Sequence, residues 1–218
     1  MQEPVFHENI RIETPAADIL RRLGFRRRLT RLPAGQRRLV EGLVSEAAGS
    51  IALKGVSLIL RIAANDGRRV TLEGGVEFES ASLAGFLRAC PQALLMGATA
   101  GAGIMEAIAA ATQAQEMTRA VVFDAVASEM TDDALGWLMA YHAGILRRRG
   151  GALMARRYSA GYGDFPLENQ RSFYRLLRLE RIGITLTESC ILTPEKSVTA
   201  ICGVAAEANL SGSGERTV

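Results

Sequence analysis

A long helical pattern constrains the fold of this chain more than any other feature. From Gly101 to Arg149 the sequence is rich in Ala, Met, Glu and Leu, which have high helix propensity. The predicted break in this stretch lies near Met117 to Thr118. Shorter helical patterns occupy residues 14–24, 34–51, 80–90 and 169–183. Helix signals flank the first of these, with Thr14 as N-cap, Pro15 at the first position and Gly24 as a stop.

Strand patterns lie between the helical blocks. Residues 55–64 and 68–80 are joined by Asn65-Asp66-Gly67, the strongest short hairpin signal in the chain. A buried strand is predicted over 93–99, a loop leading into a strand over 150–156, and a final pair of strands over 189–194 and 196–205.

The order of these elements predicts the fold class. Strands that follow one another directly, with helical blocks around them, favour an α+β fold with a mainly antiparallel, twisted sheet flanked by helices. The chain shows no internal repeat and no clear linker, so we expect one domain over residues 1–208. The Gly- and Ser-containing stretch 209–218 is expected to be a disordered tail.

Composition narrows the possible functions. The net charge of +3 arises mainly from arginine clusters at 26–28 and 147–149, and only 6% of residues are aromatic. Because no nucleic-acid motif or interleaved aromatic residue accompanies these clusters, we expect no nucleic-acid partner. The chain contains no apolar run of membrane-spanning length and no secretory signal pattern, which predicts a cytoplasmic protein without membrane contact.

Local catalytic and metal-binding patterns are missing from the sequence. The three cysteines are far apart and the two histidines, His7 and His142, are isolated, so no metal site is expected. Ser159 and Ser189 have no neighbouring histidine, so no catalytic triad is expected either. The glycines of "GATAGAG" (97–103) match neither nucleotide-binding pattern and are interpreted as packing glycines.

An acidic group lies within the long helical block. Glu129 shares a helix face with Asp132 and Asp133, whereas Asp124 lies well round the helix. Most such acids are solvated, so Glu129 has a special role only if its face lines a cleft.

The connector "RRYSAGYGDFPLENQ" (156–170) is unusually rich in special residues. Arg157 offers a planar fork for a carboxylate, Gly161 permits close backbone approach, and Tyr162 offers a face that attracts cations. Two interpretations stay open on these residues alone: a ligand loop, or an elaborate helix entry in which Asp164 caps the helix that follows.

The same stretch resembles a known family. Arg157, Gly161, Tyr162 and Pro166, together with the blocks 186–189 and 194–198, resemble the activation domain of cobalamin-dependent methionine synthase. The earlier segments "DILRRLGF" and "FESASLAGFLRACPQALLMGATAG" are similar to short, free-standing relatives of that domain.

The resemblance implies binding of S-adenosylmethionine. It implies that Arg157 holds the methionyl carboxylate and that the backbone from Tyr158 through Ser159, Ala160 and Gly161 to Tyr162 wraps the ligand. Glu129 approximately matches the acid that the family places on the preceding helix, and Glu188 lies in the matching block 186–189. We therefore expect Arg157, Glu129, Glu188 and residues 158–162 at the site, with no catalytic residue in the chain itself.

The resemblance also implies a reaction and its partners. The expected process is reductive remethylation of cob(II)alamin, with the cobalamin carried by a methionine synthase or a related corrinoid methyltransferase. The electron would come from a separate donor, flavodoxin-like or another reductase.

Departures from the family pattern occur at Gly151, at 163–165 and at Ile201-Cys202. The alternatives are an adaptor that docks on a corrinoid protein without binding the ligand, and a small-molecule methyltransferase, which the lack of a Rossmann-type glycine loop disfavours.

Overall fold

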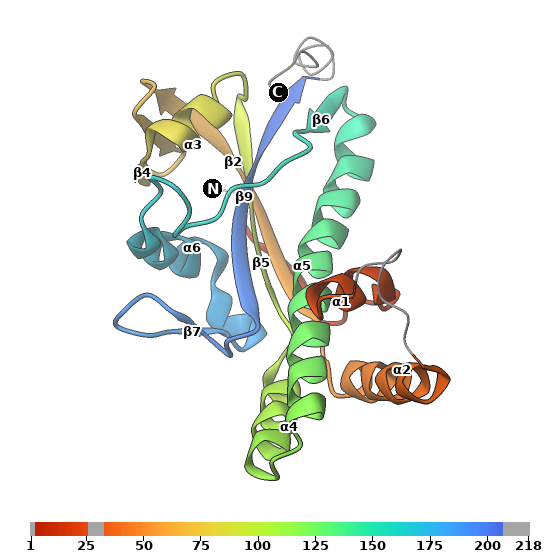
Figure 1. The fold of residues 1–218 in the computed structure, drawn as a ribbon. Coiled ribbons are helices and arrows are strands. Elements are labelled where there is room, and N and C mark those ends of the chain that lie inside the picture. Colours follow the sequence, from red (N-terminus) through yellow and green to blue (C-terminus); the bar gives the residue numbers. More distant parts are fainter. Residues whose placement is uncertain (1–2, 26–32, 207–218) are drawn as a thin grey trace.

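The computed structural model describes residues 3–25 and 33–206 and centres on a curled, antiparallel sheet (Figure 1). Its strands run in the order β4-β3-β2-β5-β9-β6, and β1 pairs with β2 off this path. Their bounds are β1 Val5–His7, β2 Lys54–Asn65, β3 Arg69–Leu72, β4 Glu77–Glu79, β5 Gln92–Thr99, β6 Gly151–Leu153 and β9 Ser197–Ala206. Two short strands, β7 (Thr185–Leu186) and β8 (Leu192–Thr193), form a separate sheet. The α+β prediction is confirmed.

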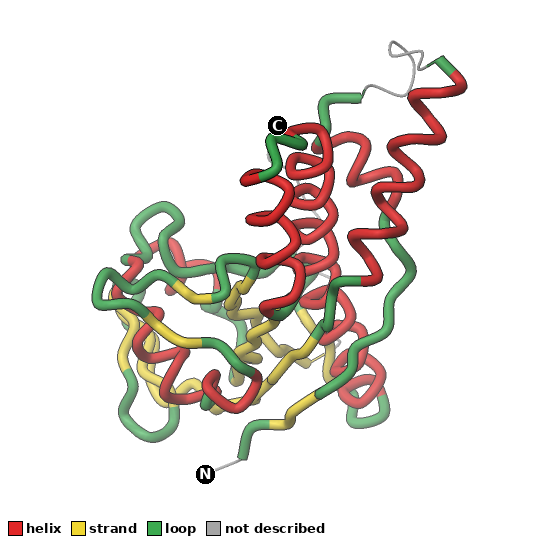
Figure 2. The backbone as a smooth tube through the Cα atoms, turned by 90° about the horizontal axis from the view of Figure 1, so that it is seen from below, coloured by secondary structure: helices red, strands yellow, loops and turns green. Residues whose placement is uncertain are grey.

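Helices cover both faces of the main sheet. The helical bounds are α1 Ala16–Arg22, α2 Ala34–Gly49, α3 Ala81–Phe86, α4 Ala102–Gln113, α5 Met117–Arg147 and α6 Gln170–Leu177, with 3-10 turns η1 Leu167–Asn169 and η2 Leu179–Ile182. Figure 2 shows the longer helices gathered on one side of the strands. This layer contains α1, α2, α4 and α5, whereas α3 and α6 pack on the other face. The long helical prediction was correct, and its break lies just before Met117.

The central strand β5 separates two apolar cores. Leu94 and Met96 point into the core under α5, while Ala93 and Leu95 point into the core under α6. Alternate residues of a strand face opposite sides, so a strand between two helical layers must be apolar throughout. Gly97 belongs to this close packing, because an added Cβ there would lie 2.7 Å from Leu179 Cδ2.

Several predicted elements differ in extent from those observed. The strand expected over 68–80 divides into β3 and β4, because Gly74 and Gly75 adopt positive φ angles of 92° and 80°. The helix expected over 169–183 begins as a 3-10 turn and ends at Leu177, where Arg178 adopts a left-handed conformation. Gly183 then terminates η2 rather than a continuous helix.

Two further local predictions are corrected. Helix α1 begins at Ala16 with Pro15 at the N-cap and no side-chain cap, so Thr14 does not cap it. The two C-terminal strands do not pair with each other: β8 pairs with β7, while β9 lies in the main sheet between β5 and β6. The arginine cluster at 26–28 and the tail 209–218 lie outside the described residues.

The described helices do not meet the length and hydropathy that a bilayer-spanning helix requires. Over residues 3–25 and 33–206, every helix is too short or too polar to span a bilayer.

Candidate functional site

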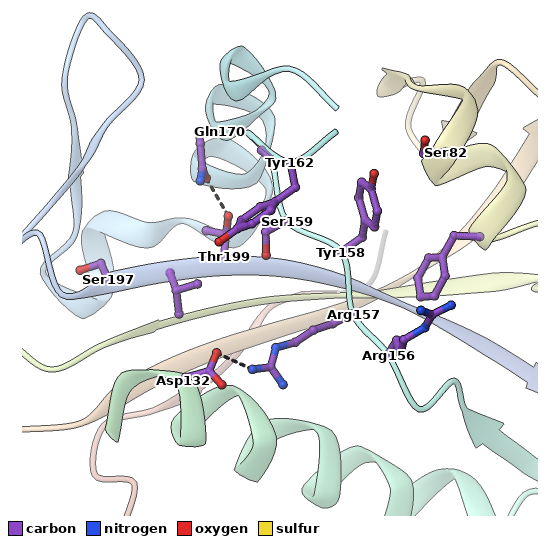
Figure 3. Close-up of a pocket in the computed structure, with 13 residues that line it drawn as sticks. Ser82, Asp132, Arg156, Arg157, Tyr158, Ser159, Tyr162, Gln170, Ser197 and Thr199 are labelled. Carbon is purple, nitrogen blue, oxygen red and sulfur yellow. Dashed lines mark hydrogen bonds and ion pairs between the residues drawn. The ribbon is translucent and has the colours of Figure 1, made fainter. Parts of the chain in front are cut away.

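A cavity of about 750 Å³ lies where the 156–162 loop meets strand β9 (Figure 3). Its walls come from the loop, from Ser82 and Phe86 of α3, from Asp132 of α5, from Gln170 of α6 and from residues 197–199 of β9. Side chains from both helical layers therefore meet at one place. The volume lies within the range typical of small-molecule sites.

The loop is fixed to the sheet through its backbone. Tyr158 N donates to the carbonyl of Ile201, and Ile201 N donates to the carbonyl of Tyr158, both at 2.8 Å. The exit of the loop is closed by Gly161 N, which donates to Phe165 O at 2.8 Å. Gly161 has a φ of 93°, a conformation that glycine adopts without steric cost. The side chains between these anchors are thereby held at the cavity.

A charged pair joins two walls of the cavity. Arg157 Nη2 donates to Asp132 Oδ1 at 2.5 Å, linking the loop to α5. The guanidinium carries five N–H donors, so this bond leaves others free to bind an anion. The surroundings of Asp132 are acidic: burial, with the charges of Asp132, Asp18 and Glu129, raises the pKa of Asp133.

Aromatic and polar side chains complete the lining. Tyr162 is 70% exposed, so its ring stands free at the cavity. Phe86 and Tyr158 lie with ring centroids 6.1 Å apart on the side nearest α3. On the opposite side, Thr199 Oγ1 donates to Gln170 Oε1 at 2.7 Å, which satisfies both buried groups. The cavity thus has an aromatic side, a hydroxyl-rich side and a charged pair between them.

The predicted site residues divide into two groups. The cavity lining contains Arg157, Tyr158, Ser159, Ala160 and Tyr162, and Gly161 lies between the last two. Two predicted acids lie elsewhere.

Neither of these acids is part of the lining. Glu129 forms an ion pair with Arg22 of α1. Glu188 lies between β7 and β8, where its main-chain carbonyl accepts a hydrogen bond from Arg171 at 2.7 Å. The acid at the cavity is Asp132, one helical turn beyond Glu129. The i, i+3 spacing places both acids on one helix face but does not show which of them meets the loop.

Asp164 corrects one of the two interpretations of the connector. It does not cap the following helix, which is entered through Pro166 and η1. Its carboxylate instead accepts hydrogen bonds from Ser80 Oγ, Ala81 N and Ser82 N at the start of α3, at 2.7, 2.7 and 3.2 Å. The bonds from Ser80 and Ser82 hold the pKa of Asp164 at about 2.

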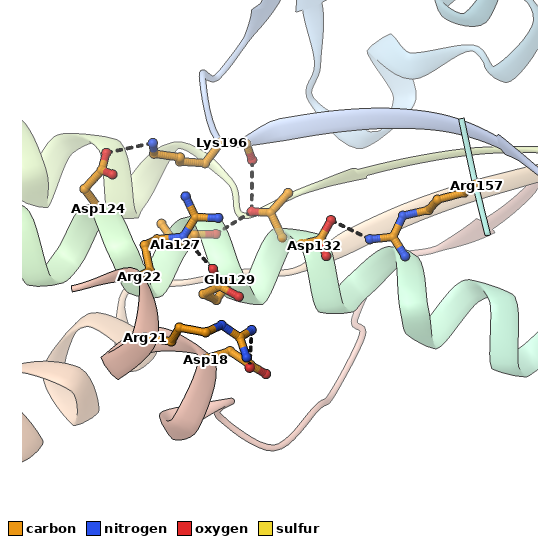
Figure 4. A network of polar contacts seen from close by, with 10 residues as sticks. Asp18, Arg21, Arg22, Asp124, Ala127, Glu129, Asp132, Arg157 and Lys196 are labelled. Atoms are coloured by element: carbon orange, nitrogen blue, oxygen red, sulfur yellow. Dashed lines mark hydrogen bonds and ion pairs between the residues drawn. The ribbon is translucent and has the colours of Figure 1, made fainter. Parts of the chain in front are cut away.

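A smaller depression of about 240 Å³ continues the site along α5. Figure 4 shows the ion pairs formed by its charged residues. The depression shares Asp132 with the cavity and adds Arg22 and Lys196. Lys196 forms ion pairs with Asp124, at 2.7 Å, and with Glu195. Arg22 and Lys196 are thus paired with acids, as Arg157 is with Asp132. Among the described residues, His, Cys, Asp and Glu side chains nowhere form a group of three able to hold a metal ion.

Comparison with known proteins gives a structural match. No family model and no curated protein matches the sequence. A solved structure described as the MetH reactivation domain bound to AdoHcy aligns with a TM-score of 0.65, covering 94% of this chain and 75% of that chain. The chain has the fold of the MetH reactivation domain.

The reactivation-domain fold confirms the architecture that the family resemblance implied. The sequence identity with the MetH domain is 12%, so the likeness shows the fold alone. The roles of individual side chains here rest on the geometry of this chain's own cavity.

Proposed function

We propose that this protein binds S-adenosylmethionine in the cavity beneath the 156–162 loop and supports reductive remethylation of cob(II)alamin on a partner protein. The observation that carries the proposal is the pairing of Arg157 with Asp132 across this cavity. The MetH reactivation domain of similar fold was solved with AdoHcy, the product that remains when S-adenosylmethionine gives up its methyl group.

The charges of the cavity fit the methionyl end of the ligand. In this proposal Arg157 binds the carboxylate through the fork donors that Asp132 does not occupy. Asp132 then faces the ammonium group. The ligand and the protein thus form two ion pairs, carboxylate with Arg157 and ammonium with Asp132. In this proposal Asp132, and not Glu129, is the helix acid that the family resemblance implied at the site, because Glu129 is engaged with Arg22.

The remaining lining fits the rest of the ligand. The exposed face of Tyr162 attracts the sulfonium charge, as aromatic faces attract cations. The hydroxyls of Ser159, Ser197 and Thr199 supply hydrogen-bonding partners for the ribose. The backbone of residues 158–162 wraps the ligand, and the cavity volume accommodates a nucleoside-sized molecule.

The reaction requires a corrinoid partner and an electron. One electron from an external flavodoxin-like or other reductase converts partner-bound cob(II)alamin to cob(I)alamin. The cobalt electron pair then attacks the sulfonium methyl carbon, the carbon–sulfur bond breaks, and methylcobalamin and S-adenosylhomocysteine form. This chain contributes binding and orientation, while the cofactor supplies the difficult chemistry.

Ligand binding tests the first half of the proposal. Titration calorimetry with S-adenosylmethionine and S-adenosylhomocysteine should give saturable binding with one site per chain. Absence of binding at millimolar ligand would reject this function and leave the adaptor hypothesis, in which the fold docks on a corrinoid protein without the ligand.

Catalytic support is tested separately. When this chain is present, a cobalamin-loaded corrinoid protein should form methylcobalamin from S-adenosylmethionine and a one-electron reductant. The absorption spectrum of methylcobalamin measures the rate. Equal rates with and without the chain would show that ligand binding serves another purpose.

A further inference from the structure

Asp164 connects two walls of the cavity that are distant in sequence. It lies on the loop that supplies residues 156–162, and it binds the first residues of α3, which supplies Ser82 and Phe86. The contact spans 83 residues of sequence between Ala81 and Asp164. Both connected segments therefore line the same space from different directions.

The contact at α3 is specific to a carboxylate. Ser80 Oγ accepts from Leu83 N at 3.0 Å and donates its own proton to Asp164 Oδ1. Asp164 Oδ2 accepts from the backbone N–H groups of Ala81 and Ser82. All three of its partners are donors, so the position requires a side chain that only accepts hydrogen bonds. Its pKa of about 2 keeps Asp164 in that form.

The next residue provides a second attachment to the same unit. Phe165 is 1% exposed and packs edge-to-face on Phe78, with ring centroids 5.4 Å apart. Phe78 belongs to β4, which leads directly into Ser80 and α3. Adjacent residues of the loop thus hold the β4–α3 unit at two points, one polar and one apolar. Two points fix orientation as well as distance.

From this geometry we infer that Asp164 is a positioning residue for the ligand, setting the separation between the α3 wall and the loop wall of the cavity. This inference rests on the proposed function. Asp164 itself does not line the cavity, so it acts on a ligand through Tyr162 and Tyr158 on one side and through Phe86 and Ser82 on the other.

The test variant is Asp164→Asn. The amide retains an oxygen for the Ser80 hydroxyl but turns its NH2 group toward the N–H donors of Ala81 and Ser82. The affinity for S-adenosylhomocysteine, measured by calorimetry, should fall about tenfold or more, because a charged acceptor is lost and the two walls separate.

Asp66→Asn is a matched control. Asp66 is also an exposed carboxylate that accepts two backbone N–H groups, from Arg68 and Arg69, at the β2–β3 turn. It does not line the cavity. If Asp164 has only a structural role, both variants should shift the denaturation midpoint and neither should change affinity. A positioning role predicts that the affinity of Asp164→Asn alone is reduced.

Hydrogen exchange provides a readout that needs no ligand. In Asp164→Asn the amides of Ala81, Ser82 and Gly161 should exchange faster than in the wild type, while the β5 amides stay unchanged. If the wild type binds and Asp164→Asn binds equally well, the positioning role is rejected and the proposed function stands. If the wild type does not bind, the proposed function fails. Equal exchange rates in Asp164→Asn and the wild type at Ala81, Ser82 and Gly161 would reject the link between the two walls, whether or not the wild type binds the ligand.

Discussion

Asp132 Oδ1 accepts a hydrogen bond from Arg157 Nη2, so α5 and the 156–162 loop meet through one charged contact at the cavity. The side chains are 57% and 27% exposed, so both still reach solvent and a ligand. A molecule with a carboxylate next to an ammonium group can engage both partners without leaving either charge unpaired.

Replacement of the guanidinium should abolish recognition of the ligand carboxylate. Arg157→Ala should weaken S-adenosylmethionine binding by about 10- to 100-fold, the effect typical of losing a hydrogen-bonded charge pair. Calorimetry with decarboxylated S-adenosylmethionine isolates the cause: that analogue should bind the wild type weakly and should lose little further affinity in Arg157→Ala. Arg119→Ala, which removes an arginine paired with Glu46, is the control and should bind normally. If Arg157→Ala loses the same affinity for both ligands, Arg157 does not bind the ligand carboxylate.

Asp132 and Glu129, both on α5, should behave differently when they are neutralised. Asp132→Asn should reduce affinity about tenfold, because the ligand ammonium loses its counter-charge and Arg157 loses its partner. Glu129→Gln should change affinity less than about twofold, since Glu129 is not in the lining and is paired with Arg22. If calorimetry shows a larger loss of affinity for Glu129→Gln than for Asp132→Asn, Glu129 and not Asp132 is the acid that contacts the ligand.

Gly163 should be intolerant of a side chain for two separable reasons. Its φ is 59°, and an added Cβ would lie 2.7 Å from Tyr158 Oη. Gly163→Ala should therefore lose about 1 kcal/mol of unfolding free energy from the backbone alone, plus the cost of displacing Tyr158. Gly67→Ala, at φ 87° with open space around the Cβ, measures the backbone cost separately.

A second substitution tests the steric part. Tyr158→Phe removes the hydroxyl and should restore part of the stability lost in Gly163→Ala, while giving no benefit to Gly67→Ala. Urea denaturation of the single and double variants checks this, and strictly additive effects at positions 158 and 163 would contradict the contact.

Acid should destabilise the fold through His142. Burial, with the charge of His7, lowers the pKa of His142 from 6.5 to about 4. Between these two pH values His142 binds a proton in the unfolded chain but not in the folded chain. The free energy of unfolding is therefore unaffected by His142 above pH 6.5 and decreases as the pH drops from 6.5 toward 4. The loss is at most about 3 kcal/mol.

A variant isolates this effect. His142 Nε2 lies 2.8 Å from Ser57 Oγ, and the glutamine amide of His142→Gln can bond to that hydroxyl without titrating. The denaturation midpoint of His142→Gln should vary less between pH 7 and pH 4 than that of the wild type, although its stability at pH 7 is lower. Parallel pH profiles would assign the acid sensitivity to other groups.

Local signals in the sequence predicted most of the secondary structure but few of its long-range connections. The Asn65-Gly67 hairpin and the long helices follow from neighbouring residues, and both were confirmed. One interpretation of the connector made Asp164 the cap of the following helix, whereas its partners at Ser80 and Ala81 become adjacent only through tertiary folding. Asp132 was missed as the acid at the cavity for a similar reason, since helix periodicity cannot show which residue of an acidic face meets the loop.

The reciprocal backbone bonds between Tyr158 and Ile201 suggest a use for this protein as a scaffold. These bonds join backbone N–H and C=O groups, which are present whichever side chains follow. The register of the loop on β9 is therefore set at Tyr158 and does not depend on the side chains of residues 159–162. Libraries that randomise positions 159, 160 and 162, while keeping Gly161 for its φ of 93°, should retain the anchor on β9 and present new surfaces to the cavity. Selection from such libraries offers a route to receptors for other small, doubly charged metabolites.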